Sequence, residues 1–462
     1  MQENIVAQTK RPGPSTAFIV LLLGQLISLT GSGLTTFALG VWVFQLTKST
    51  TLFTLIAFFA LIPGIVLSPI AGVVADRFNR RLTMFLSNLI AAIVSAAVFL
   101  LLISHTFTMV YLYISVFALA ILSTLLRPTF NASITLLVPS EMLGKANGLV
   151  QLVQATSQTV APLIAGILVL GIGIQGIILC DLISYLFACL TLLCIAIPQP
   201  KVTLAEKQKV LSSSQLFYGW TYLSQRSGLL GVLIFSSLCS FLLGMAGALL
   251  APLVLSFTSA AALGTIQFVG GCGMFVGAIG MSIWGGPKRQ IYAVLGFILT
   301  SGIFMSLVGL QDLVWLIAVA AFGVFFCLPI INGAIAAILQ SKVAPEVQGR
   351  VFAFAQMITG IVTPFAYLLA GPLADKVFNP LLVKNGALAN TVGRIIGVGP
   401  GRGIGLIFIA ISLLLIIMSL VGWLHPRIRR VELELSDHRG VDVADAPVAL
   451  ATSPDRDQVS VQ

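Results

Sequence analysis

Residues 72–81 read Gly72-Val-Val-Ala-Asp76-Arg77-Phe-Asn-Arg80-Arg81, a short charged stretch between two long apolar ones. The flanking apolar stretches cover residues 50–75 and 82–104, and a helix needs about 20 apolar residues to cross the hydrocarbon core of a bilayer. Three arginines at such a turn mark it as cytoplasmic, because positive charge gathers on the inner side of membrane proteins. The stretch therefore predicts two membrane-crossing helices joined by a cytoplasmic loop.

The rest of the chain repeats this pattern. Of its 462 residues, 58% are hydrophobic and only 9% are charged, against about 25% charged in soluble domains. This composition excludes a water-soluble fold, and the alternating decapeptides of a membrane β-barrel are absent. Ten further apolar stretches are long enough to cross a bilayer: 17–46, 108–137, 147–171, 174–197, 229–256, 260–284, 290–310, 313–340, 351–374 and 404–424. We therefore expect an all-α membrane protein with twelve transmembrane helices.

The twelve expected crossings form two bundles of six helices, residues 17–197 and 229–424, joined by a basic linker at 198–228. Residues 1–16 form a polar tail, and residues 425–462 form an acidic tail that lacks apolar periodicity and is expected to be disordered. The inner loops and tails hold 19 of the 25 Lys and Arg residues. This asymmetry predicts that the linker and both termini are cytoplasmic. It also explains the net charge of +10 without a nucleic-acid partner.

The two expected bundles share sequence features. A shift of 205 residues aligns Gln151 with Gln356, and a shift of 201 residues aligns Asn131 with Asn332. We therefore expect a parallel repeat, with a pseudo-twofold axis along the membrane normal and a cavity between the halves near the midplane. This architecture indicates a transporter.

The charged stretch that follows the second span also carries a family signature. It resembles the Gly-x-x-x-Asp-Arg-x-x-Arg-Arg loop of the major facilitator superfamily, in Gly72, Asp76, Arg77, Arg80 and Arg81. The resemblance implies a conformational latch, in which the glycine allows close helix approach and the acid forms salt bridges with arginines. The matching loop of the second half keeps Gly277 opposite Gly72 but has Met281 in place of Asp76. The latch is therefore expected in the N-terminal half.

Further motifs resemble particular branches of this superfamily. The run Ala161-Pro162-Leu-Ile-Ala165-Gly166 is similar to the Gly-Pro-x-x-Gly-Gly signature of drug/proton antiporters, with alanine at two glycine positions. Helix packing alone also favours small residues beside a helix proline, so both interpretations stay open. The polar first span, with Ser68-Pro69 and Arg127-Pro128, resembles the macrolide-efflux and siderophore-exporter branch. This implies proton-coupled export of an amphipathic macrolide, siderophore or peptide-like compound by alternating access.

Asp181 is a charged residue inside the span 174–197, about seven residues from its outer end. At 1.5 Å per residue it lies roughly 10 Å deep. Such a residue is a functional candidate by default, because intramembrane charge is energetically expensive. Desolvation favours the neutral carboxyl, which suits reversible protonation. Asp181 either carries the coupling proton or has a structural role, such as capping a neighbouring backbone.

Arg127 is the second intramembrane charge, and the position of Pro128 after it frees a backbone carbonyl. Three roles for Arg127 stay open: it binds a substrate anion, forms a structural ion pair, or extends its side chain to the inner membrane surface. The difference in depth between Arg127 and Asp181 disfavours a direct ion pair of these two residues. The remaining cavity candidates are polar residues that either bind a ligand or join helices: Gln25, Ser28, Ser32, Asn131, Gln151, Gln154, Asn332 and Gln356.

Several other classes of protein are disfavoured by the sequence. The six cysteines lie in apolar runs without a CxxC motif, and the three histidines are isolated, so we expect no metal site, no cofactor and no enzyme activity. A GxxxxGK[ST] motif for nucleotide binding is also absent. We expect a monomer in the inner or plasma membrane whose partners are lipid, a small molecule and protons. Uptake or facilitated transport by the same fold, and a non-transporting receptor or scaffold, are the alternatives.

Overall fold

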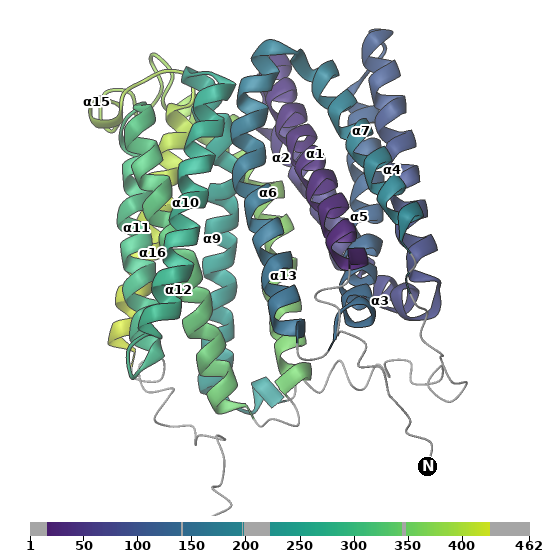
Figure 1. The fold of residues 1–462 in the computed structure, drawn as a ribbon. Coiled ribbons are helices and arrows are strands. Elements are labelled where there is room, and N and C mark those ends of the chain that lie inside the picture. The colour runs from purple at the N-terminus through teal and green to yellow at the C-terminus, as the bar shows by residue number, and fades with distance from the viewer. Residues whose placement is uncertain (1–15, 140–141, 196, 198–221, 344–347, 426–462) are drawn as a thin grey trace, which may run out of the picture.

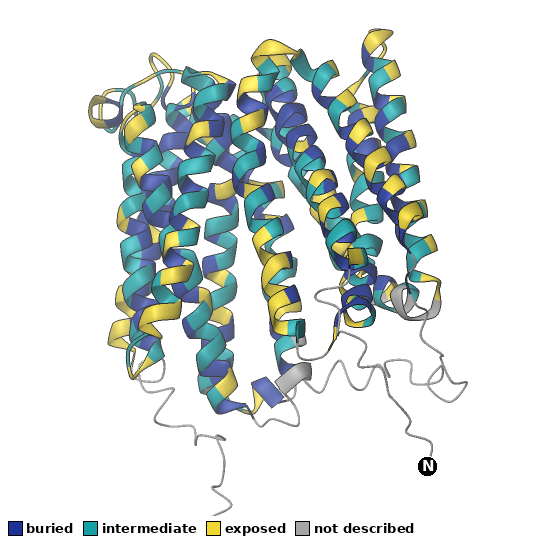
Figure 2. Ribbon diagram, viewed as in Figure 1, coloured by how far each residue is buried: buried dark blue, intermediate teal, exposed yellow. Residues whose placement is uncertain are grey.

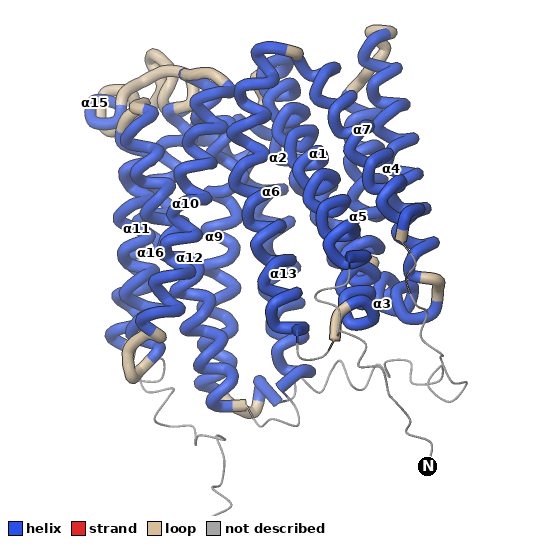
Figure 3. The backbone as a smooth tube through the Cα atoms, viewed as in Figure 1, coloured by secondary structure: helices blue, strands red, loops and turns tan. Residues whose placement is uncertain are grey.

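The computed structural model describes residues 16–139, 142–195, 197, 222–343 and 348–425 (Figure 1). In this part of the chain all regular secondary structure is helical (Figure 3). The helices of the N-terminal half are α1 (Thr16–Thr47), α2 (Thr50–Val66), α3 (Ser68–Arg77), α4 (Arg80–Ile103), α5 (Met109–Leu137), α6 (Leu143–Gly171) and α7 (Gly173–Cys194). Those of the C-terminal half are α9 (Ser227–Phe257), α10 (Ala260–Trp284), α11 (Gln290–Leu310), α12 (Val314–Lys342), α13 (Gln348–Pro372), the π-helix η3 (Leu373–Phe378), α14 (Asn379–Leu381), α15 (Gly393–Ile396) and α16 (Arg402–Leu424).

Eleven of the described helices are long and apolar enough to cross a membrane. The second predicted span, 50–75, is instead divided into α2 and α3 at Leu67. The Leu67 N–H donates the last hydrogen bond of α2 to the Pro63 carbonyl, at 2.8 Å. Pro69 has no N–H and therefore cannot continue the pattern of backbone hydrogen bonds. Together α2 and α3 complete the second crossing, which confirms the predicted twelve-helix membrane fold.

The two bundles repeat the same packing scheme (Figure 1). In the N-terminal bundle α1 packs against α6 and α7, α4 packs against α5 and α7, and α2 and α3 pack against α5. In the C-terminal bundle α9 packs against α13 and α16, α11 packs against α12 and α16, and α10 packs against α12. Each of these pairs thus has its counterpart in the other half, which confirms the parallel repeat.

Small residues bring the helices of each bundle close together. A Cβ added at Gly31 of α1 would collide with the Ser184 side chain on α7, and one at Gly277 of α10 would collide with the Phe326 carbonyl on α12. Such contacts are typical of membrane helices, since association there depends on close packing rather than on the hydrophobic effect. Many large apolar residues are instead exposed, among them Ile283 and Leu424 at 83% and 82%. Figure 2 shows exposed residues along the helices of both bundles.

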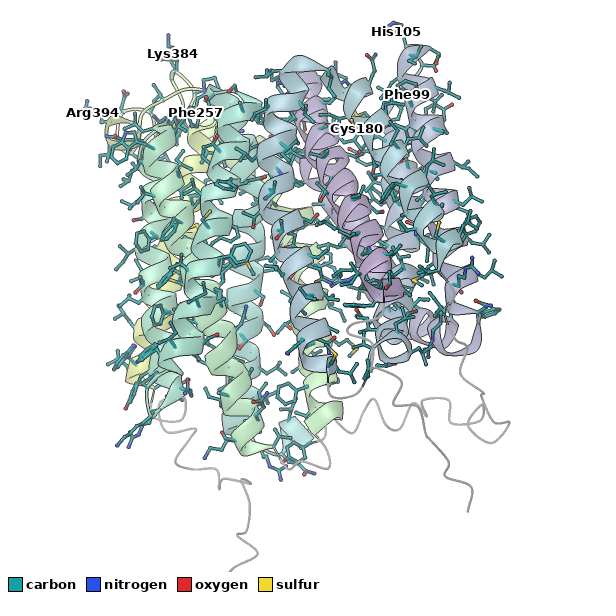
Figure 4. All side chains as sticks on the ribbon, viewed as in Figure 1. Phe99, His105, Cys180, Phe257, Lys384 and Arg394 are labelled. Carbon is teal, nitrogen blue, oxygen red and sulfur yellow. The ribbon has the colours of Figure 1, made fainter. Side chains whose placement is uncertain are left out.

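The two ends of the described chain, Thr16 and His425, lie at the same end of the molecule (Figure 1). We name this the inner end, because the distribution of basic residues predicts that it is cytoplasmic. His105, Lys384 and Arg394 lie at the opposite, outer end (Figure 4). The predictions for the acidic tail and most of the linker fall on residues 426–462 and 198–221, outside the described part of the chain.

Candidate functional site

A cavity of about 730 Å³ lies between the two bundles. Helices α1, α2, α5 and α6 line it from the N-terminal half, and α9, α10 and α13 line it from the C-terminal half. Its volume falls within the range of small-molecule sites, roughly 300–1,000 Å³. We call it the central cavity. Its polar lining residues are Gln25, Thr36, Arg127, Asn131, Gln154, Ser157, Gln158, Gln267 and Tyr367.

Arg127 and Asn131 lie one turn apart on α5, so both side chains share one face of that helix. Both are exposed within the open cavity. Among the described residues that line the central cavity, Arg127 is the only one with a full charge. No hydrogen bond or ion pair joins its guanidinium to another described residue, and it forms no pair with Asp181, as the depth of the two residues predicts.

Asp181 is fully buried where α1, α4 and α7 meet. The Ser95 hydroxyl of α4 donates to its Oδ2 and the Ser184 hydroxyl to its Oδ1, both at 3.4 Å. One turn further along α7, the Tyr185 hydroxyl bonds the Ser32 hydroxyl of α1 at 2.8 Å. Among the described residues no cation pairs with the carboxyl. Asp181 is therefore surrounded by hydroxyl groups and lacks a counter-charge in this part of the structure.

A second cavity, of about 780 Å³, connects these features inside the N-terminal half. Asp181, Tyr185 and Ser32 line one of its walls, and Gly72 of α3 lines it toward the inner end. We call it the side cavity. It shares Arg127 and Asn131, among other residues, with the central cavity. The cavity that contains Asp181 therefore adjoins the central cavity.

The Ala161–Gly166 motif lies at the contact between the halves, near the outer end of α6. A Cβ added at Gly166 would lie 2.7 Å from the Ala260 carbonyl of α10, and one added at Gly264 of α10 would collide with the Pro162 carbonyl. Ala161 and Ala165 are both fully buried. The small residues of the motif thus let the backbones of two helices from different halves meet, whichever of the two interpretations holds for its function.

Asp375 of η3 joins the halves at a second point of the outer end. Its carboxylate accepts four hydrogen bonds from the start of α2: from Ser49 Oγ at 2.9 Å, Thr50 N at 3.1 Å, and Thr51 N and Oγ1, both at 2.8 Å. A carboxylate from the C-terminal half therefore caps a helix of the N-terminal half, where free N–H groups and the helix dipole favour negative charge. The two halves are closed against each other at the outer end.

The charged stretch of residues 72–81 differs in part from its prediction. Gly72 lies inside α3, within the predicted second span, but a Cβ there would meet no atom within 4 Å, so it makes no close helix contact. Arg80 Nη1 donates to the Ala132 carbonyl of α5 at 2.9 Å. The side chains of Asp76 and Arg77 lie outside the described part of the structure. The latch stays a prediction.

Arg81 ties α4 to the end of α7. Its Nε donates to the Leu192 carbonyl at 2.7 Å and its Nη2 to the Leu193 carbonyl at 2.8 Å. Both carbonyls belong to the last turn of α7, which has no intrahelical donors left for them.

Replacing Arg81 with Gln is expected to lower the unfolding free energy by about 1–2 kcal/mol, since two charge-assisted hydrogen bonds to these carbonyls are lost. The midpoint of thermal unfolding in detergent measures this. Arg289→Gln is the matched control, because Arg289 is exposed and its described hydrogen bond goes to the Tyr292 hydroxyl one turn away. Equal midpoints for the two variants would show that Arg81 does not stabilise α7.

The other predicted cavity residues do not all line the same cavity. Gln25 and Gln154 line the central cavity, and Ser32 lines the side cavity. Asn332 and Gln356 instead line a separate cavity of about 460 Å³ inside the C-terminal half. Ser28 is buried against its own bundle, where its carbonyl accepts from Ser32, and Gln151 is exposed on α6 without lining any of these cavities.

Five polar lining residues are not among the sequence candidates: Thr36, Ser157, Gln158, Gln267 and Tyr367. Gln158 follows Gln154 by four residues and therefore lies on the same face of α6, so its spacing was a usable signal. Gln267 and Tyr367 are isolated in apolar helices of the C-terminal half and carry no such pattern. Among the described residues no group of three His, Cys, Asp or Glu side chains could hold a metal ion.

A family model described as Major Facilitator Superfamily matches residues 21–379. Macrolide efflux protein A of Streptococcus pyogenes is 24% identical over 371 residues, which cover 78% of this chain and 90% of that protein. Macrolide efflux protein A of Enterococcus faecalis is 26% identical over 312 residues, 66% of this chain and 95% of that protein.

Two solved structures share the fold. A crystal structure of a mutant of the nucleoside transporter NupG has a TM-score of 0.70 at 12% identity and covers 88% of this chain and 99% of its own. The inward-facing, unoccupied structure of a bacterial homologue of the lysosomal transporter Spinster has a TM-score of 0.67 at 15% identity, with 92% and 99% of the two chains covered. At these low sequence identities, the similarity to the two structures concerns the fold alone.

Proposed function

The chain belongs to the Major Facilitator Superfamily, and we propose that this membrane transporter exports an amphipathic organic compound in exchange for protons. The observation that carries the proposal is the central cavity, which both halves line and which adjoins the side cavity containing Asp181. We further propose that it works in the plasma membrane with both termini cytoplasmic, since its relatives are bacterial efflux proteins and its inner loops are basic.

The lining of the central cavity supports an amphipathic cargo. Amide side chains at Gln25, Gln154, Gln158 and Gln267 both donate and accept hydrogen bonds. The residues between them are largely apolar, including Phe37 and Phe53, as is usual for sites that bind organic ligands. A large organic compound of mixed polarity suits such a lining, and two relatives are named for macrolide efflux.

Asp181 supports coupling to protons. The hydroxyl groups of Ser95 and Ser184 hydrogen-bond the carboxyl in either protonation state, because a hydroxyl can donate or accept. No described cation holds it in the charged form. The carboxyl can therefore take up a proton from one side and release it to the other as the bundles move.

Alternating access follows from how the halves meet. The described contacts of α6 with α10 and of α2 with α13 and η3 close the outer end, while Arg127 and Asn131 are exposed in the cavity. We assign this arrangement to the inward-facing state. To release its cargo outward, the protein must break the Gly166–Ala260 and Asp375–Thr51 contacts and bring the inner ends together.

Inverted membrane vesicles with an acidic interior test the proposal. A panel of macrolides and other amphipathic natural products is added, and loss of the pH gradient is followed with a fluorescent dye. We expect at least one compound to dissipate the gradient in vesicles that contain the protein and not in empty ones. Gradient-independent flux would instead favour a facilitative carrier, and saturable binding without any flux would favour a receptor.

A further inference from the structure

We infer that the transported compound carries an anionic group, such as a carboxylate, sulfonate or phosphate, which pairs with Arg127 in the central cavity. The inference rests on the proposed transport function and adds the charge of the cargo to it. Its starting point is the charge of the lining. Every other described residue of the central cavity is formally neutral, and Arg127 carries a permanent positive charge at any physiological pH.

The position of Arg127 favours a ligand over a structural role. It lies well inside α5, ten residues from the inner end of that helix at Leu137, yet its side chain is exposed to the cavity and joined to no described partner. A charged group at such depth is expensive unless it meets an opposite charge or water. Water fills the open cavity in the inward-facing state, and a bound anion takes its place when cargo enters.

The neighbours of Arg127 also suit an oxyanion. Its planar guanidinium offers paired N–H donors in a geometry that matches two oxygens of one carboxylate or sulfonate. Asn131 lies one turn away on the same face of α5 and can donate from its amide. Gln154 and Gln158 of α6 line the same cavity and offer further amide donors. No described acid in the central cavity competes for these donors.

The same charge acts against cationic cargo. An ammonium group placed near Arg127 would meet like-charge repulsion, which is stronger in a cavity of low effective dielectric than in water. A purely cationic amphiphile should therefore bind poorly, whereas a zwitterion is accepted if its amine points away from α5. The charge of the lining thus selects among compounds that its apolar surface alone would admit.

A matched pair of dyes tests the inference by binding alone. 8-Anilinonaphthalene-1-sulfonate and N-phenyl-1-naphthylamine share one ring system and differ in the sulfonate. Their fluorescence is titrated with the protein in phosphatidylcholine nanodiscs, and the signal from empty nanodiscs is subtracted. We expect the wild type to bind the sulfonate at least about tenfold more tightly than the neutral dye, as one charge-assisted pair allows.

Three variants make the test specific. Arg127→Gln should lose most of the sulfonate preference while its affinity for the neutral dye stays within about twofold, and Arg127→Lys should keep part of the preference. Arg394→Gln is the control, since Arg394 lies at the outer end, away from the cavity (Figure 4), and should match the wild type. Unchanged binding of the neutral dye also shows that each variant is folded.

Two results would overturn the inference. One is a wild type that does not bind the sulfonate, or binds it no better than the neutral dye. The other is an Arg127→Gln variant that keeps the full preference. Neither result bears on proton-coupled export, which the vesicle experiment measures separately. Failure of the vesicle experiment with intact dye discrimination would leave a charge-selective binding site without the proposed coupling.

Discussion

Asp181→Asn is expected to reduce substrate-driven proton movement to background while the protein stays folded. Asparagine has nearly the same shape, and its amide can keep hydrogen bonds to Ser95 and Ser184, but it has no proton to exchange. The measurement is the pH gradient of inverted vesicles with any compound that dissipates it in the wild type. Exchange of labelled for unlabelled compound without a gradient should persist, because that reaction needs no net proton transfer.

Asp312→Asn is the matched control for this prediction. Asp312 lies in the outer turn between α11 and α12, where its carboxylate pairs with Arg402 at 2.8 Å. Burial raises the pKa of Asp312, and the charge of Arg402 opposes that shift. Unlike Asp181, Asp312 lines none of the described cavities. Coupled transport should survive in this variant. Full coupled transport by Asp181→Asn would remove Asp181 from the mechanism, and loss of exchange as well would indicate a structural role.

Much of the fold was predictable from the sequence because the bilayer requires long apolar helices. Every predicted crossing is present, and the depth of Asp181 in its helix is close to its expected position, since a regular helix converts residue number directly into distance. The break at Leu67 was the exception. Pro69 was visible in the sequence, but whether a proline kinks a helix or ends it depends on packing against α5.

The candidate site was less predictable, because side-chain direction depends on how helices rotate against their neighbours. Asn131 and Asn332 align in the repeat, yet one lines the central cavity and the other a separate cavity of its own half. The surroundings of aligned glycines also differ. Gly277 packs tightly against α12, whereas its counterpart Gly72 lines open space. The hydrogen bonds between Asp375 and Thr51 join residues 324 positions apart, and no local sequence pattern predicts them.

Asp375→Ala is expected to open the outer end of the protein. The substitution removes four hydrogen bonds between the halves and the cap of α2. We expect the opening free energy to fall by about 2 kcal/mol, which is roughly a thirtyfold change in the opening equilibrium. Hydrogen–deuterium exchange in nanodiscs measures this, and the Thr50 and Thr51 amides should exchange faster.

The decisive readout lies away from Asp375. If the carboxylate holds the halves together, peptides that cover Gly166 and Gly264 at the α6–α10 contact should exchange faster too, because all outer contacts must break together. Ser49→Ala is the comparison variant: it removes the local cap on Leu52 and one of the four bonds to the carboxylate, that of Ser49 Oγ, but keeps the bonds of Thr50 and Thr51. Its effect should stay within the first turn of α2. If Asp375→Ala speeds exchange only in the first turn of α2, Asp375 acts as a helix cap and does not hold the two halves together.

A weaker outer contact should also change the transport cycle, since each cycle must return the protein to the inward-facing state. Asp375→Ala stabilises the outward-facing state relative to the inward-facing one, so the cavity opens less often to the cytoplasm. Export should slow even at saturating substrate, while dye binding at Arg127 should weaken only in proportion to the smaller inward-facing population. An export rate equal to that of the wild type would show that another step limits the cycle and that the Asp375 contact does not set the balance between the two states.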